Sequence, residues 1–355
     1  MRKILLSFTL IALSIVSVTA CSVPQRDTSE PKEPAKVQGT KAYVNTANEG
    51  GSISKVDVNT NAVVETITQE GSVHNVQVSP DGKILGATLV PVSKGNMSGM
   101  SGGAQMEMNG VALFLDTSTD QLIKKVEVGE HPAHIVFTND GKYALVTNNE
   151  SNNVSVIDLS SYKVIKTIET GNGPHGFRVS KDSKFAYVAN LGSDTVSVLD
   201  LSGFKEVSKI KVGKSPVTTG VTSDGKTMFV SVNAENSLAM VDLASGKIEK
   251  IAVGTGPAQV YLQSDDKFIF VANQGTEEKP SNSVSKIDLA TRQVVATIET
   301  GKGAHGLVVS TDNKYVFVTN MYDDTISVID NNNNKVISTI KVGKTPNGIS
   351  LLQSQ

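Results

Sequence analysis

Cysteine, tryptophan and a strong net charge are missing or scarce in this sequence of 355 residues. The single cysteine, Cys21, excludes an intramolecular disulfide, and the lack of tryptophan argues against an aromatic sugar-binding platform. The formal net charge is −2 without a basic cluster, so nucleic acid is not expected as a partner. No G-x-S-x-G, H-E-x-x-H or phosphate-binding glycine loop is present, which disfavours an enzyme without deciding the question.

Long apolar runs are scarce too, and the one near the N-terminus is too short to span a membrane comfortably. It follows Arg2 and Lys3 and ends in Val-Thr-Ala-Cys, which resembles a bacterial lipobox. We therefore expect residues 1–20 to be a lipoprotein signal peptide and Cys21 to be lipidated, the alternative being an ordinary secretory signal. Residues 21–40 are rich in proline, serine and charge, as in a disordered tether. These features predict a monomer outside the cytoplasm, anchored to the bacterial membrane through its lipid.

What the sequence does contain is a unit of about 42 residues that occurs seven times. Each unit ends in a β-rich run closed by a glycine, and these glycines are Gly71, Gly129, Gly171, Gly213, Gly254, Gly301 and Gly343. Between glycines, four short apolar runs alternate with turn residues, a pattern typical of one β-propeller blade. No long 3.6-residue periodicity follows residue 40, so we expect no helices there.

The two ends of the repeat region indicate how the ring closes. The first unit begins at its second strand, residues 42–44, and the chain ends with an additional first strand, residues 348–352. The C-terminal strand should therefore complete the N-terminal blade, which leaves the ring without free ends. The sequence predicts an all-β protein in which residues 41–355 form a seven-bladed propeller.

Aspartate and asparagine recur in register from unit to unit. Recurring aspartates can indicate calcium or acid catalysis, but Asp also hydrogen-bonds its own backbone in tight turns, and we interpret them in this way. Asparagine ends most of the second strands, at Asn148, Asn190, Asn233, Asn273 and Asn320. We give these the same interpretation as turn residues, because Asn tolerates left-handed backbone.

The strand sequences carry a family resemblance. Second strands read YVNT (43–46), LVTN (145–148), YVAN (187–190) and FVTN (317–320), and a third strand reads VSVIDL (154–159). These motifs resemble the YVTN-type β-propeller family of bacterial envelope and surface-layer proteins, over residues 41–355. The resemblance implies the fold and an envelope location. Because family members bind varied partners, it implies no particular activity.

All five histidines occur at the start of a first strand, just after a closing glycine. They are His74, His131, His134, His175 and His305. First strands line the central channel of a propeller, so we expect these side chains near one mouth of the channel. Imidazole is a ligand for copper and zinc, although histidines that merely bond neighbouring backbone at a turn would give the same pattern.

A methionine-rich insertion, residues 94–110, joins the second and third strands of the blade that begins with His74. It contains Met97, Met100, Met106 and Met108 among glycine and serine, where no core needs filling. In an antiparallel blade this connection lies at the same end as the histidines. Thioether sulfur selects Cu(I), so the sequence predicts a copper-binding His/Met face, unless the insertion is a low-complexity loop with accidental methionines.

Three functions follow from these observations. The first is an envelope-anchored binding protein that captures copper on its His/Met face. The second is a metal-free scaffold that binds an envelope protein or a cell-wall polymer. The third is a metalloenzyme centred on the hub of the propeller, or a lactonase-like hydrolase.

Overall fold

The computed structural model describes residues 42–92 and 109–353. The predicted signal peptide (1–20), the tether (21–40) with Cys21, and the four methionines of the insertion lie outside the described residues. Asn109 and Gly110, the last residues of the predicted insertion, already belong to a strand. None of the helical structure in the described part of the chain is long and apolar enough to cross a membrane.

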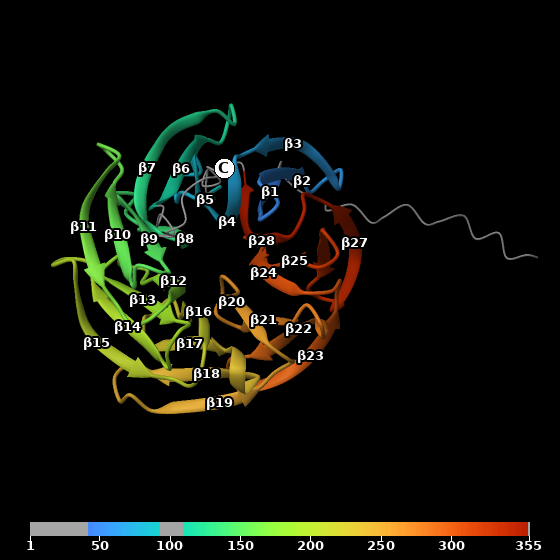
Figure 1. The fold of residues 1–355 in the computed structure, drawn as a ribbon. Helices are drawn as coiled ribbons and strands as arrows, with labels where there is room; N and C mark the ends of the chain where they lie inside the picture. The colour runs from blue at the N-terminus through green and yellow to red at the C-terminus, as the bar shows by residue number, and fades with distance from the viewer. Residues whose placement is uncertain (1–41, 93–108, 354–355) are drawn as a thin grey trace, which may run out of the picture. The chain divides into compact units, whose positions relative to one another are not determined.

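Seven four-stranded antiparallel sheets form a ring around a central channel (Figure 1). The innermost strands are β4 (Gly71–Val78), β8 (Pro132–Phe137), β12 (Pro174–Val179), β16 (Pro216–Val221), β20 (Pro257–Leu262), β24 (Ala304–Val309) and β28 (Pro346–Gln353). The second strands are β5 (Ile84–Pro91), β9 (Tyr143–Asn148), β13 (Phe185–Asn190), β17 (Thr227–Val232), β21 (Phe268–Gly275), β25 (Tyr315–Asn320) and β1 (Ala42–Asn48). The third strands are β6 (Asn109–Asp116), β10 (Asn153–Asp158), β14 (Thr195–Asp200), β18 (Ser237–Asp242), β22 (Pro280–Asp288), β26 (Thr325–Asp330) and β2 (Ser52–Asp57). The outermost strands are β7 (Leu122–Glu130), β11 (Lys163–Glu169), β15 (Lys205–Lys211), β19 (Ile248–Ala252), β23 (Gln293–Glu299), β27 (Lys335–Lys341) and β3 (Ala62–Thr68). Each blade is named below by its innermost strand.

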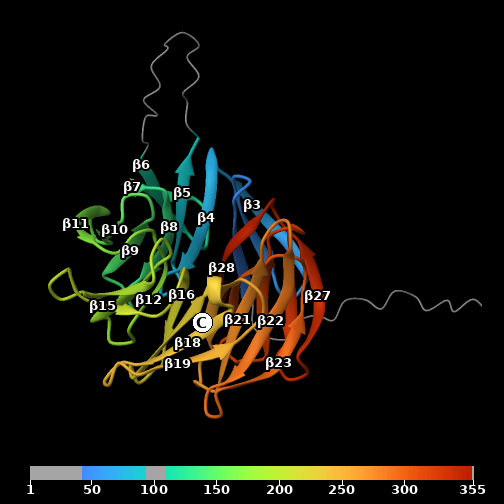
Figure 2. The ribbon, with the colours of Figure 1, turned by 60° about the horizontal axis from the view of Figure 1, so that its bottom comes forward.

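The ring closes as the sequence predicts. The last strand, β28, pairs antiparallel with β1, and Val44 lies opposite Leu351. The resulting sheet has the order β28-β1-β2-β3, so one blade combines both ends of the described chain. Figure 2 shows β23 and β27 on the outside of the ring. The prediction of an all-β seven-bladed propeller is therefore confirmed.

The hydrophobic core lies between neighbouring blades. One cluster joins Val136 and Leu145 of the β8 blade to Phe177, Val188 and Leu199 of the β12 blade, and similar clusters fill the other interfaces. The largest fully buried side chains are Phe114, Phe177, Phe229, Phe270 and Phe317. Removing one such phenylalanine costs about 3–5 kcal/mol of stability, so the interfaces hold the innermost strands rigidly in place.

The asparagines that end second strands do not act as the sequence suggested, whereas the aspartates do. Asp182 accepts hydrogen bonds from Ser180 Oγ (2.6 Å) and Lys184 N (3.1 Å) within its own turn. Asn148 instead lies in the strand β9 and is not among the residues with positive φ. Its Nδ2 atom donates to Ser155 Oγ (2.9 Å), which ties the second strand to the third.

These asparagines also explain the closing glycines. A Cβ atom on Gly129 would lie 2.7 Å from Asn148 Cγ, which is too close for any other residue. The same clash recurs for Gly171, Gly254, Gly301 and Gly343 against Asn190, Asn273, Asn320 and Asn48. The repeated glycine is therefore required by close packing. Asn233 is an exception, because it begins a three-residue 3-10 helix (η1, Asn233–Glu235), the one departure in the described residues from the expectation of no helices.

Candidate metal centre

Every innermost strand has a β-bulge near its start, and these bulges position the histidines. In β8, Pro132 pairs with Asn148 and Ile135 with Val146, so three steps along β8 match two along β9. The other six innermost strands show the same shift at the same place. A bulge bends its strand and re-aims side chains, and here two successive residues of each strand occupy it. The residues in these bulges include His74, His134, His175 and His305.

Three of these histidines, from consecutive blades, come together at the channel mouth. One ring nitrogen each of His74, His134 and His175 lies within 4.8 Å of the others. The ring centroids are separated by 4.8 Å for His134 and His175 and by 5.3 Å for His74 and His175. His134 is 1% exposed and His175 is 8% exposed, while His74 is partly buried. We call these three residues the His triad.

Glu49, in the turn after β1, fixes the orientation of His74. Its Oε1 atom lies 3.1 Å from His74 Nδ1 and accepts a hydrogen bond of 2.7 Å from Asn347 Nδ2. Burial alone raises the pKa of Glu49, but the contacts with His74 and Asn347 outweigh it and lower the pKa to about 2. The group is therefore a carboxylate, which only accepts hydrogen bonds, so the proton between them belongs on His74 Nδ1.

A backbone carbonyl fixes His175 in the same way. His175 Nδ1 lies 3.2 Å from the carbonyl oxygen of Val217, which also only accepts, so Nδ1 is protonated. Burial, followed by the charge of His74, lowers the pKa of His175 to about 3, so the ring is neutral at pH 7 and its Nε2 atom has a free electron pair.

The remaining ring nitrogens of His74 and His175 lie within hydrogen-bond distance of each other. His74 Nε2 and His175 Nε2 are 3.2 Å apart. A proton on one of the two atoms, or a metal ion bound by both, accounts for this separation. With metal–nitrogen bonds of 2.0–2.1 Å, a separation of 3.2 Å corresponds to an angle of about 100°, close to tetrahedral.

His134 supplies a third donor. Its Nε2 atom is buried and has no hydrogen-bond partner in the described part of the chain. Burial, then the neighbouring His175 and His74, lower the pKa of His134 well below its usual value, so it too is neutral. The triad thus offers three imidazole nitrogens, and metal-binding histidines usually donate their other ring N–H to a carboxylate or carbonyl, as His74 and His175 do here.

The structure does not bring the other two histidines into the triad. His131 precedes β8 with a positive φ of 47°, and its Nδ1 atom lies 3.3 Å from Glu150 Oε1 on the exposed rim. His305 occupies a bulge in β24 and is buried, and burial followed by His74 lowers its pKa to about 4. The β28 blade, with Asn347, separates the β24 blade from that of His74.

Unpartnered polar atoms continue around the channel mouth. Five bulge residues have a buried polar atom without a hydrogen-bond partner among the described residues, namely His134 Nε2, Thr218 Oγ1, Gln259 Nε2, His305 Nδ1 and Asn347 Oδ1. Buried polar groups normally have a partner, which can be an ordered water or a ligand. Each of these atoms is available to an ordered water or to a ligand at the mouth of the channel.

Both ends of the methionine-rich insertion meet this mouth. Pro91, at the end of β5, pairs with Gly71 at the start of β4, three residues before His74. Asn109, at the start of β6, pairs with Glu130. Both stems of the insertion therefore lie at the end of the blade from which the histidines start, although Met97, Met100, Met106 and Met108 are outside the described residues.

The sequence matches the family described as "YNCE-like beta-propeller" over residues 101–265 and 264–355. The protein belongs to this family. A search of curated proteins finds no match.

Solved structures share the fold of this YNCE-like propeller at low sequence identity. Hydrazine synthase from Kuenenia stuttgartiensis aligns with a TM-score of 0.67 and 22% identity over 78% of this chain and 89% of that chain. A functionally unknown protein from Desulfotomaculum acetoxidans gives a TM-score of 0.73 and 14% identity over 88% and 99%. A putative 6-phosphogluconolactonase from Bacteroides fragilis gives 0.68 and 15% over 90% and 100%. At these identities the likeness concerns the fold alone.

The sequence analysis missed two side chains that support the triad of this YNCE-like propeller. Glu49 follows the asparagine that ends a second strand, where other blades have Asn149, Leu191, Asn233, Gln274 and Met321. It is the one acid in that series, so comparing the units position by position would have found it. Asn347 occupies the unit position that His74, His175 and His305 take in other blades. Its side chain is the partner of Glu49.

Proposed function

We propose that this protein binds a single transition-metal ion at the His triad and that the metal is copper. The observation that carries the proposal is the pair of Nε2 atoms of His74 and His175, 3.2 Å apart, whose Nδ1 atoms face Glu49 and Val217 on the far side. Such an arrangement leaves both electron pairs directed at one point. A metal ion satisfies them both.

Charge and ligand type favour copper. Imidazole suits copper and zinc alike, but three neutral donors do not neutralise a divalent ion in a buried site. One carboxylate, Glu49, accompanies the triad, so a Cu(I) ion would leave the centre with no net charge. The thioethers of Met97, Met100, Met106 and Met108 are soft ligands of the kind that select Cu(I), and their loop is anchored at the same mouth.

We further propose that the protein works in the bacterial cell envelope as a copper-binding lipoprotein, for capture, storage or delivery. The support is the lipobox-like sequence before Cys21 and the polar tether that follows it. A lipid on Cys21 would hold the propeller near a membrane, where metal entering from outside can be bound.

A hydrolase that uses zinc is the second candidate, and one observation favours it. Three histidine ligands leave a fourth coordination position free, as in catalytic zinc sites. Whether the resident metal is exchangeable separates the two candidates, because a carrier must release its ion. A lactone or ester hydrolysis assay with zinc-loaded protein tests the second candidate directly.

The experiment that tests the proposal is a competition titration of Cu(I) and Zn(II) against chelators of known affinity. We expect one ion to bind per chain, with Cu(I) preferred. His175→Ala should weaken binding at least tenfold, or about 1.4 kcal/mol. His305→Ala is the matched control, because His305 is also buried and occupies a bulge but lies outside the triad.

Two results would contradict the proposal. If the wild-type protein takes up neither metal, the metal-free scaffold that binds a protein or polymer replaces it. If His305→Ala and His175→Ala weaken binding equally, the ion is not held by the triad.

A further inference from the structure

The far ends of the innermost strands enclose a second site. A cavity of about 320 Å³ lies among the last residues of β4, β8, β12, β16 and β20, whereas the His triad lies at the starts of the first three of these strands. In β12, Arg178 follows His175 by three residues, which is roughly 10 Å along a strand. The cavity therefore belongs to the opposite mouth of the channel.

A cation without a counter-ion dominates this cavity. Arg178 is the charged side chain among the lining residues, and no carboxylate in the described part of the chain is within salt-bridge distance of it. One guanidinium nitrogen donates to the carbonyl of Phe177 (2.9 Å), which leaves most of its N–H groups without a protein acceptor. The guanidinium also lies over the ring of Tyr261, 5.7 Å from the ring centroid. This contact holds the cation in place without neutralising it.

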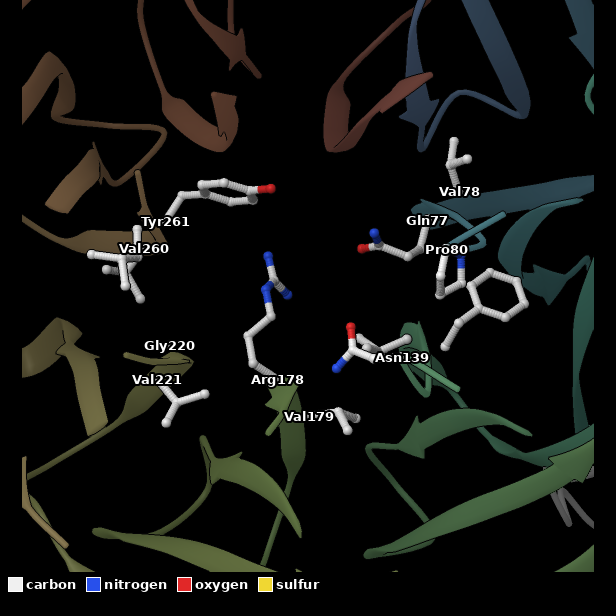
Figure 3. Close-up of a pocket in the computed structure, with 13 residues that line it drawn as sticks. Gln77, Val78, Pro80, Asn139, Arg178, Val179, Gly220, Val221, Val260 and Tyr261 are labelled. Carbon is white, nitrogen blue, oxygen red and sulfur yellow. The ribbon is translucent and has the colours of Figure 1, made fainter. Parts of the chain in front are cut away.

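Polar groups from other blades point toward the same space. Figure 3 shows the guanidinium of Arg178 between the hydroxyl of Tyr261 and the side-chain amide of Gln77, with Asn139 beside them. These residues come from four blades, and the guanidinium and the Tyr261 hydroxyl supply donors, while the two carboxamides carry both donor and acceptor atoms. Arg178 is half-buried, and a guanidinium that is partly removed from water favours a ligand of opposite charge.

We propose that this mouth is a binding site for a small organic or inorganic oxyanion, either a carboxylate or a phosphate. The ligand is an acceptor because Arg178 only donates and no acid among the lining residues competes for it. A guanidinium binds carboxylate and phosphate through paired hydrogen bonds. A volume of about 320 Å³ is at the lower limit for small-molecule sites, so the ligand is small. The site goes beyond the proposed metal function and does not depend on it.

Titration calorimetry and thermal unfolding with acetate, succinate and inorganic phosphate, in chloride-free buffer, test this proposal. We expect saturable binding of at least one of the three with a Kd below about 1 mM, and the ranking tells a carboxylate site from a phosphate site. Arg178→Gln should weaken the binding at least tenfold. In the absence of anions it should not lower the unfolding temperature, because it removes an unpaired charge.

Two controls keep the test specific. Arg292→Gln removes a cation that pairs with Glu249 on the outside of the propeller and should leave anion binding unchanged. His175→Ala should also leave it unchanged, which separates this site from the metal centre. If Arg178→Gln does not fold, Tyr261→Phe takes its place, because it removes only the hydroxyl and should weaken binding by roughly two- to tenfold.

The proposal is overturned if none of the three anions binds saturably in the millimolar range. It is also overturned if Arg292→Gln weakens the binding as much as Arg178→Gln does, since that would indicate attraction by overall charge.

Discussion

The two mouths of the channel are formed by the same seven strands and have opposite chemistry. At the strand starts, His134 and His175 are held neutral and lie beside His74, so the three ring nitrogens come together at one point. At the strand ends, Arg178 and Tyr261 present donors and a positive charge. One mouth is therefore suited to a cation and the other to an anion. A repeated fold with one backbone geometry can thus hold two unlike sites, because each mouth is decided by a few side chains from different blades.

The largest expected effect comes from a residue between the two sites. Phe177 lies between His175 and Arg178 in β12 and is fully buried at the interface with the β8 blade. Phe177→Ala should lower the free energy of unfolding by about 3–5 kcal/mol and weaken both sites, since both depend on the position of β12. Chemical denaturation and the two titrations measure this. Phe185→Ala, at an exposed position of the same blade, should change stability by no more than about 0.5 kcal/mol.

Acid should affect the histidine mouth selectively. The folded protein keeps His305 neutral down to a pKa of about 4 and His175 down to about 3, while the unfolded chain takes up protons below about 6.5. The unfolded state therefore binds more protons, and stability should fall as the pH drops from 6.5 toward 4, by about 3 kcal/mol for each of these two histidines. Glu49, with its pKa lowered to about 2, adds a further loss only below about pH 4.5.

Unfolding free energies measured between pH 4 and pH 8 check this prediction, and His305→Asn should remove part of the dependence. Arg178 stays charged throughout this range, so its variant should leave the pH profile unchanged. A flat profile in the wild type would mean that the histidines are hydrated and not held neutral.

Removing the support of His74 should have a smaller effect, confined to one mouth. Glu49→Gln keeps the shape of the side chain but removes the negative charge that faces His74 Nδ1. Loss of a carboxylate that accepts from a metal-binding histidine typically lowers metal affinity by about 10–100-fold, and anion binding should not change. Glu150→Gln is the matched control, because Glu150 pairs with His131 on the exposed rim. Equal effects of both variants would indicate that only the general charge of the mouth matters.

The smallest effect concerns the residue that holds Glu49. Asn347→Ala removes the 2.7 Å hydrogen bond to Glu49 Oε1. We expect the binding free energy of the metal to weaken by roughly 1 kcal/mol, the contribution of one hydrogen bond, so that the dissociation constant rises severalfold. The same chelator competition measures it, with Asn332→Ala in an exposed turn as control. An unchanged affinity would show that Glu49 is held firmly enough by its own backbone contact with Thr345.

The fold could be predicted from the sequence because every blade repeats the same close contacts between its strands. Gly129 and Asn148 illustrate it: the glycine is needed because the asparagine lies directly over it. The pair therefore recurs at a fixed spacing and marks each blade in the sequence. The asparagine was nevertheless predicted to be a turn residue. The ring closure could also be predicted, since β1 and β28 each lack a neighbouring strand that the other supplies.

The site could be predicted only in part. The sequence indicated that the histidines lie near one mouth of the channel, but it did not indicate which of them come together. His134 stands one unit position later than His74 and His175, and only the bulge brings it beside them. A bulge is a shift in register and leaves no clear signal in the residues of one strand. His305 shares the unit position of His74 and His175 yet belongs to a different part of the ring. The blades of His175 and His305 are each two steps from that of His74 around the ring, so the unit position alone does not tell which of the two joins His74.

The most direct test of the central claim is an anomalous difference map from crystals of the protein loaded with Cu(I). The account predicts one strong peak at the triad mouth, within bonding distance, about 2.0–2.1 Å, of nitrogen atoms from His74, His134 and His175. Crystals of His175→Ala should lose the peak, while those of His305→Ala should keep it. A peak elsewhere, or no peak under conditions in which copper is bound in solution, would contradict the assignment of the metal to these three histidines.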